Sequence, residues 1–178
     1  MIARSMLLRA PRVTLRPLSP TDTDALARLL TEPRIRATYM IPDFADRAAA
    51  ERYCARLEEL SASESRFVCG IDLDGELIGF LNDCGTEGGR IELGYFISPE
   101  HWNRGYATEA LRAAIDELFR IGYDTVVAGH FEENPASRRV MEKCGMHPLA
   151  ETATIAYRGA EHRVLYMAVG APRGQTSC

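Results

Sequence analysis

The 178-residue sequence has no long apolar run. The arginines near its start surround only Met6-Leu7-Leu8, which is far too short for the apolar core of a signal peptide, and no stretch approaches the length of a membrane span. We therefore expect a soluble, cytoplasmic protein that does not bind a membrane.

The cysteines, histidines and positive charges are too few or too scattered for a disulfide-rich, metal-binding or nucleic-acid-binding protein. The five cysteines are an odd number without a C-x-x-C pair, so no disulfide framework is expected. The four histidines stand singly without metal-ligand spacing, and we expect no metal. The formal net charge of −4 argues against nucleic acid as a partner, whereas it mildly favours cationic acceptors such as amines.

Internal repeats and interdomain linkers are absent as well, and the length suits one domain over residues 1–178. We place its core at about residues 12–170 and a flexible tail at 171–178, because the tail is rich in Gly and polar residues. Either a monomer or a homodimer is compatible with this sequence.

The order of predicted elements is typical of an α/β protein with a mixed sheet and helices on both faces. Strand and helix periods follow the order β-α-α-β-β-β-α-β-α-β-β along nearly the whole chain. The Asp74-Gly75 pair predicts a hairpin. Pro33, Pro42 and Asp43 predict a loop over residues 33–46. Helix starts are predicted at Ser19, Asp46 and Asn134, and a closing hairpin around Arg158-Gly159.

The most informative stretch runs from Arg90 to Ile121. Apolar residues alternate with polar or small ones from Ile91 to Ile97, which predicts a strand. From Ala107 the apolar residues recur at steps of three and four, the pattern of an amphipathic helix. A short loop containing Gly105 joins the two. Because the first turn of a helix has unpaired N–H groups and a partial positive charge, this unit can bind a phosphate.

The loop fits neither the P-loop pattern nor the dinucleotide pattern Gly-x-Gly-x-x-Gly. It resembles the acyl-CoA loop of the GCN5-related N-acetyltransferases (GNAT), Gln/Arg-x-x-Gly-x-Gly/Ala, and especially the Rim-type branch that acetylates protein N-termini. Trp102 is the aromatic residue familiar in that branch, whereas Asn103 replaces its usual Gly. The resemblance implies acetyl-CoA as cofactor, held at Asn103, Arg104, Gly105, Tyr106, Ala107 and Thr108. Without the resemblance, the same loop can be read as a turn that binds nothing.

Glu92 lies on the strand before the loop and alternates with the apolar residues, so its plain interpretation is a solvent-facing carboxylate. The resemblance implies instead a general base, which an amine acceptor needs because its ammonium form cannot attack a thioester. It also implies the GNAT fold, with a splayed central strand. We place a β-bulge at Gly94, and the resemblance assigns the freed backbone groups around Phe96 and Ile97 to binding pantetheine and the acyl carbonyl.

A second motif runs from Asn134 to Met146. Asn134 as an N-cap, followed by proline and ended by Gly145, accounts for these residues in purely structural terms. The motif also resembles the GNAT segment in which the Asn contacts the cofactor. Many members carry a Tyr that protonates the leaving thiolate, and this chain has Met141 at that position. Rim-type members have Ser at the position of Ser137. We therefore assign Ser137 a hydrogen bond to the leaving thiolate.

The sequence thus predicts an N-acetyltransferase that moves the acetyl group of acetyl-CoA to a primary amine, on a protein N-terminus or a small molecule, by direct attack in a ternary complex. Glu92 and Ser137 are its predicted catalytic residues. The missing Tyr leaves a second interpretation open, a regulatory domain that binds acyl-CoA without turnover. A third is a small domain for some other phosphorylated metabolite. The acceptor itself cannot be read from the sequence.

Overall fold

The computed structural model describes residues 7–172; residues 1–6 and the end of the predicted tail, 173–178 with Cys178, lie outside the described part. The strands are β1 (Leu8–Arg9), β2 (Thr14–Arg16), β3 (Val68–Leu73), β4 (Glu76–Glu87), β5 (Arg90–Ile97), β6 (Thr125–Phe131), β7 (His147–Tyr157) and β8 (Ala160–Gly170). The α-helices are α1 (Thr23–Thr31), α2 (Pro33–Arg36), α3 (Arg47–Ser61), α4 (Tyr106–Arg120) and α5 (Pro135–Lys143).

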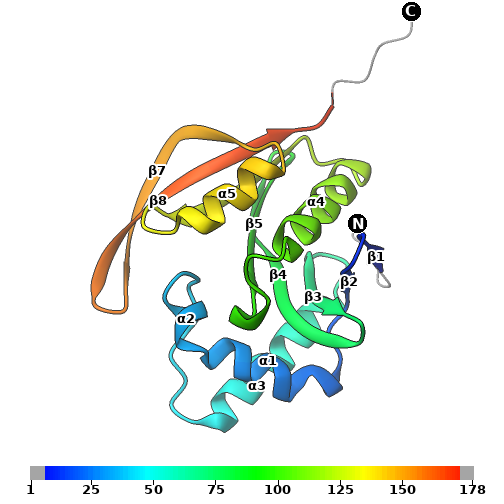
Figure 1. Ribbon diagram of the computed structural model, residues 1–178, viewed down its shortest axis with the longest axis vertical. Coiled ribbons are helices and arrows are strands. Elements are labelled where there is room, and N and C mark those ends of the chain that lie inside the picture. The colour runs from blue at the N-terminus through cyan, green and yellow to red at the C-terminus, as the bar shows by residue number, and fades with distance from the viewer. Residues whose placement is uncertain (1–6, 173–178) are drawn as a thin grey trace, which may run out of the picture.

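The strands form one mixed sheet in the order β1-β2-β3-β4-β5-β6-β8-β7. All neighbours are antiparallel except β5 and β6, which run parallel because α4 connects them. Figure 1 shows α4 and α5 across one face of the sheet and α1 to α3 gathered at its lower end. The predicted fold class, a mixed α/β sheet, is therefore confirmed.

Two apolar clusters bury the two faces of this sheet. Neighbouring residues of one strand divide between them: Leu81 packs in the cluster with α4, whereas Phe80 packs in the cluster with α1 and α3. Ile97 and Phe96 divide in the same way, because side chains alternate along a strand. The even-numbered residues of β5 therefore face α1 and α3, and its odd-numbered residues face α4 and α5.

Polar caps fix where the helices begin. Asp46 accepts a hydrogen bond from the Ala49 N–H (2.7 Å) at the start of α3, as the sequence predicted. The loop predicted for residues 33–46 is wrong at its beginning, where α2 forms a single capped turn. There the Glu32 carboxylate accepts from the Arg34 N–H (3.2 Å), and proline takes the first helical position. The two-residue strand β1 was not predicted either.

The central strand is splayed, as the resemblance implied. The pairing of β5 with β6 runs from Arg90 opposite Thr125 to Leu93 opposite Ala128 and ends there, although both strands continue. The predicted bulge at Gly94 is wrong, because the register shift lies on β4, between Asp83 and Gly85.

Gly94 serves a different purpose, the close approach of two side chains to the strand. A Cβ atom at this position would lie 2.9 Å from the Tyr39 hydroxyl and 3.0 Å from the Cys84 sulfur. Any larger residue would push Tyr39 and Cys84 off the face of β5 that carries Glu92.

Candidate active site

The open edge of β5 supplies backbone groups to the splay. The Ser98 N–H donates to the Ile78 carbonyl (2.7 Å), so Ser98, and Phe96 two residues before it, direct their backbone groups toward β4. Of the two residues predicted to offer backbone groups, only Ile97 therefore faces the splay, and the Phe96 side chain lies in the core beside α1. The Ile97 carbonyl accepts from the Trp102 indole N–H (2.7 Å), which leaves the Ile97 N–H for a ligand.

The loop after β5 presents the N-terminus of α4. Gly105 caps the helix at φ 86° without a side-chain cap, and the Glu109 N–H makes the first bond back to the Gly105 carbonyl (3.1 Å). The helix itself therefore does not use the preceding N–H groups of Tyr106, Ala107 and Thr108. Asn103 stands at φ 60°, a left-handed conformation that Asn tolerates better than most side chains, so Asn can occupy the position where the resemblance expects Gly.

Arg12, from the turn before β2, clamps this loop. Its guanidinium donates to the Arg104 carbonyl (2.7 Å) and through Nε to the Glu109 carboxylate (2.7 Å), and it lies 4.7 Å from the centre of the Tyr106 ring. The clamp draws the Arg104 carbonyl aside and neutralises the one carboxylate in the first turn of α4. Sequence reasoning missed Arg12, since no local pattern links it to a loop some ninety residues away.

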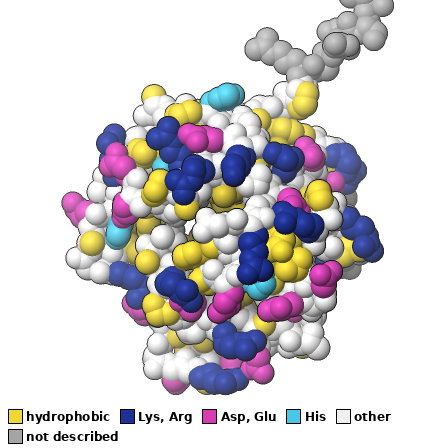
Figure 2. All heavy atoms as spheres, in the orientation of Figure 1, with side chains coloured by type: hydrophobic (Ala, Val, Ile, Leu, Met, Phe, Trp, Pro, Cys, Tyr) yellow, Lys and Arg dark blue, Asp and Glu magenta, His cyan; other side chains and the backbone are white. Residues whose placement is uncertain are grey.

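Basic side chains border the loop on the face shown in Figure 2, where Lys and Arg are spread over α4 and α5. Arg138 pairs with Glu142 (2.8 Å) along α5. Arg104, Arg139 and Lys143 are exposed, and within residues 7–172 no ion pair involves them. These three cations are thus available to a phosphorylated ligand.

Glu92 is half-buried on the face of β5 that looks toward α1 and α3. Burial raises the pKa of its carboxyl, the nearby Glu151 raises it further, and Arg90 opposes the shift. Arg90 itself pairs with Glu151 (2.8 Å). Glu92 is therefore not a fully exposed carboxylate.

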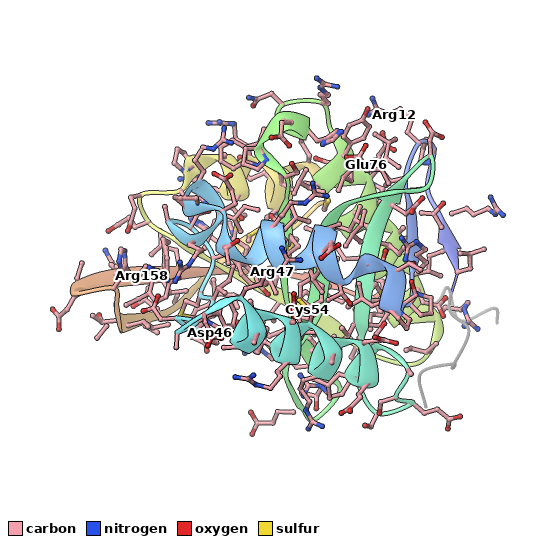
Figure 3. All side chains as sticks on the ribbon, turned by 90° about the horizontal axis from the view of Figure 1, so that it is seen from below. Arg12, Asp46, Arg47, Cys54, Glu76 and Arg158 are labelled. Carbon is pink, nitrogen blue, oxygen red and sulfur yellow. The ribbon has the colours of Figure 1, made fainter. Side chains whose placement is uncertain are left out.

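The turn of the β7–β8 hairpin contacts the segment after α2, which is distant from it in the sequence. The Tyr157 hydroxyl, at the end of β7, accepts from the Ile41 N–H (3.2 Å) and lies 3.2 Å from the Tyr39 carbonyl. Arg158 pairs with Asp43 (2.6 Å). In Figure 3 Arg158 and Arg12 lie far apart, so the turn of the β7–β8 hairpin lies away from the loop before α4.

Ser137 lies in the first turn of α5, on the opposite face of the sheet from Glu92. Its N–H donates to the Asn134 side chain (3.2 Å), so Asn134 is an N-cap and only its amide NH₂ remains for a ligand. The Ser137 hydroxyl lies 3.0 Å from the Tyr95 hydroxyl. Met141, at the position where the resemblance expects a Tyr acid, is fully buried in the core.

No described cysteine is activated as a nucleophile. Burial raises the pKa of Cys54 and Cys144 to about 11 and that of Cys69 and Cys84 to about 12. Within residues 7–172 there is no group of three His, Cys, Asp or Glu placed to hold a metal ion. The same part of the chain contains no helix long and apolar enough to cross a membrane.

A splayed mixed sheet that leads directly into a helix N-terminus without a side-chain cap is the arrangement that the resemblance to acyl-CoA acyltransferases implied. Residues 12–147 match the acetyltransferase (GNAT) domain family, so the chain belongs to that family and is an acyltransferase. This confirms the family predicted from the loop and removes the interpretation as a domain for an unrelated metabolite.

Relatives agree with this assignment. The chain is 31% identical over 116 residues to the uncharacterized N-acetyltransferase p20 of Bacillus licheniformis, an alignment covering 63% of this chain and 65% of that protein. It is 29% identical to the probable N-acetyltransferase YjcK of Bacillus subtilis, over 79% of this chain and 83% of that one. Its fold is similar to that of Mycobacterium smegmatis RimJ in complex with CoA-disulfide, with a TM-score of 0.79, 23% identity, and coverage of 97% and 90%.

Proposed function

We propose that this protein transfers the acetyl group of acetyl-CoA to a primary amine by direct attack. The observation that carries the proposal is the position of Glu92 and Ser137 on opposite faces of the sheet, beside the point where β5 and β6 part. A thioester lying in the splay would meet an acceptor on the Glu92 side and leave its thiol on the Ser137 side. Family membership and the relatives' names support the same reaction.

The residues present fit acetyl-CoA, which supplies an activated acetyl thioester when bound. The N–H groups of Tyr106, Ala107 and Thr108 would hold the pyrophosphate, and Gly105 lets it approach the backbone. Arg104 and Asn103 border that position. The Asn134 amide and the Ile97 N–H would bind the pantetheine arm and the acyl oxygen, respectively.

Glu92 would accept the proton that the attacking amine must lose. Its pKa, raised by burial, brings the carboxylate closer in basicity to the acceptor amine and makes it a stronger base than an exposed glutamate. As the C–N bond forms and the C–S bond breaks, the electron pair of the latter stays on sulfur. Ser137 would then donate a hydrogen bond to that sulfur, and a thiol of ordinary pKa near 8.5 needs little further help.

The experiment is a panel of amines, including a peptide N-terminus, a polyamine and a simple alkylamine, assayed with acetyl-CoA by thiol release. Turnover with at least one amine is expected, and mass spectrometry should place the acetyl group on nitrogen. Release of no CoA by a protein that still binds acetyl-CoA would favour the regulatory interpretation, which the burial of Met141 keeps open.

A further inference from the structure

Tyr95 links β5 to the first turn of α5. It belongs to β5, and its odd position directs its side chain toward α4 and α5. Its hydroxyl lies 3.0 Å from the Ser137 hydroxyl and 3.2 Å from the Ser137 carbonyl. Neither sequence motif assigned this side chain a function.

The Tyr95 hydroxyl remains protonated and acts as a donor. Burial raises its pKa well above the ordinary value, and the hydrogen bond to Ser137 only partly opposes the shift. A phenol in this state does not give up its proton near neutral pH, but it still has one hydrogen to donate.

The orientation of the Ser137 hydrogen depends on which acceptor Tyr95 uses. When Tyr95 donates to the Ser137 carbonyl, the Ser137 hydroxyl turns its own hydrogen toward Tyr95 and away from any ligand. When Tyr95 donates to the Ser137 oxygen, that hydrogen is free to point at a negative sulfur, and the two hydrogen bonds strengthen each other. A developing thiolate favours the second arrangement because it is the stronger acceptor.

We infer that Tyr95 is a positioning residue that acts through Ser137, orienting the serine hydroxyl so that it donates to the leaving thiolate. The inference rests on the proposed transfer reaction. In it the C–S bond breaks with its electron pair on sulfur, Ser137 donates a hydrogen bond to that sulfur, and Tyr95 keeps its proton throughout. This chain therefore orients its Ser137 donor from the strand, at a site where Met141 provides no acid.

A double-mutant cycle tests the inference. Tyr95→Phe should lower kcat about fivefold, the effect of one neutral hydrogen bond made in the transition state, and leave the KM for acetyl-CoA unchanged. Ser137→Ala should lower kcat about ten- to a hundredfold. In the Ser137→Ala background, Tyr95→Phe should have no further effect, because the residue through which it acts is gone.

Tyr53→Phe is the matched control, since it removes a tyrosine hydroxyl from α3 in the other core cluster. It should leave kcat unchanged, and circular dichroism should confirm that every variant is folded. Additive effects of Tyr95→Phe and Ser137→Ala, or a rise in KM with kcat intact, would overturn the inference. An unchanged kcat in Ser137→Ala would instead remove Ser137 from the proposed function itself, so the two failures can be told apart.

Discussion

Glu92 shows how a single residue acquires its chemistry from the surrounding fold. In the sequence it is one polar residue in an alternating strand. In the folded protein it lies half-buried near Glu151, with Arg90 engaged elsewhere, and its pKa rises. Raising the pKa of a carboxylic acid extends its protonated form to higher pH, so a base of this kind loses activity on acidification earlier than an exposed glutamate does.

At the residue scale we predict the pH dependence of turnover. The acidic limb of the kcat/KM profile should lie above the ordinary glutamate value of 4.5, and Glu92→Gln should remove that limb and lower turnover at neutral pH roughly 10²-fold. The loss should shrink as the pH approaches the acceptor's own pKa. Identical pH profiles for the parent protein and Glu92→Gln would show that Glu92 is not the base.

The same shift predicts the sign of a stability change. A carboxyl group whose pKa is higher in the folded than in the unfolded state favours folding only while it is protonated, and that contribution is lost as pH rises through the folded pKa. Glu92→Gln should therefore melt at no lower a temperature than the parent at pH 7. A clear drop in its melting temperature would mean that the change damages the fold.

At the scale of elements, the loop between β5 and α4 is held in place by Arg12. Gly105 holds a left-handed conformation, and a Cβ atom there would lie 3.1 Å from the Arg12 guanidinium. A side chain at this position would thus strain the backbone, displace the clamp and stand between the N–H groups and a phosphate.

Gly105→Val is therefore expected to abolish CoA binding, measured by isothermal titration calorimetry. Gly159→Val is the matched control, because Gly159 has a similar φ of 77° in the β7–β8 turn with open space around it. Both changes should cost about 1–2 kcal/mol of stability from backbone strain alone, but only Gly105→Val should lose the ligand. Binding that survives in Gly105→Val would place the pyrophosphate elsewhere.

For the whole molecule, acetyl-CoA would connect elements that are distant in the sequence. By the proposed contacts it would lie against the N-terminus of α4, at Tyr106 to Thr108, and against the start of α5, at Asn134. A ligand bound across both is lost only when the fold is lost, so its binding free energy adds to the free energy of unfolding.

Differential scanning fluorimetry measures this effect. At a concentration about a hundred times its Kd, acetyl-CoA should add about 2.7 kcal/mol and raise the melting temperature by roughly 5–10 °C, while NAD and ATP should not. Equal shifts with all three ligands would contradict a site built for acyl-CoA.

The sequence by itself determined what depends on neighbours along the chain. Periodicity placed the strand from Ile91 to Ile97 and the helix after Gly105, and capping residues placed the starts of α3 and α5. The loop motif was enough to predict the family, because the residues that bind a phosphate at a helix N-terminus are consecutive.

Tertiary structure decided everything that depends on residues distant in the sequence. The bulge fell on β4 rather than β5 because strand pairing sets its position, and the same pairing turned the backbone of Phe96 away from the splay. Arg12 contacts the loop before α4, and Tyr95 contacts Ser137, only because the sheet and helices bring these residues together. Local sequence patterns do not predict such contacts, because they depend on how the elements pack against one another.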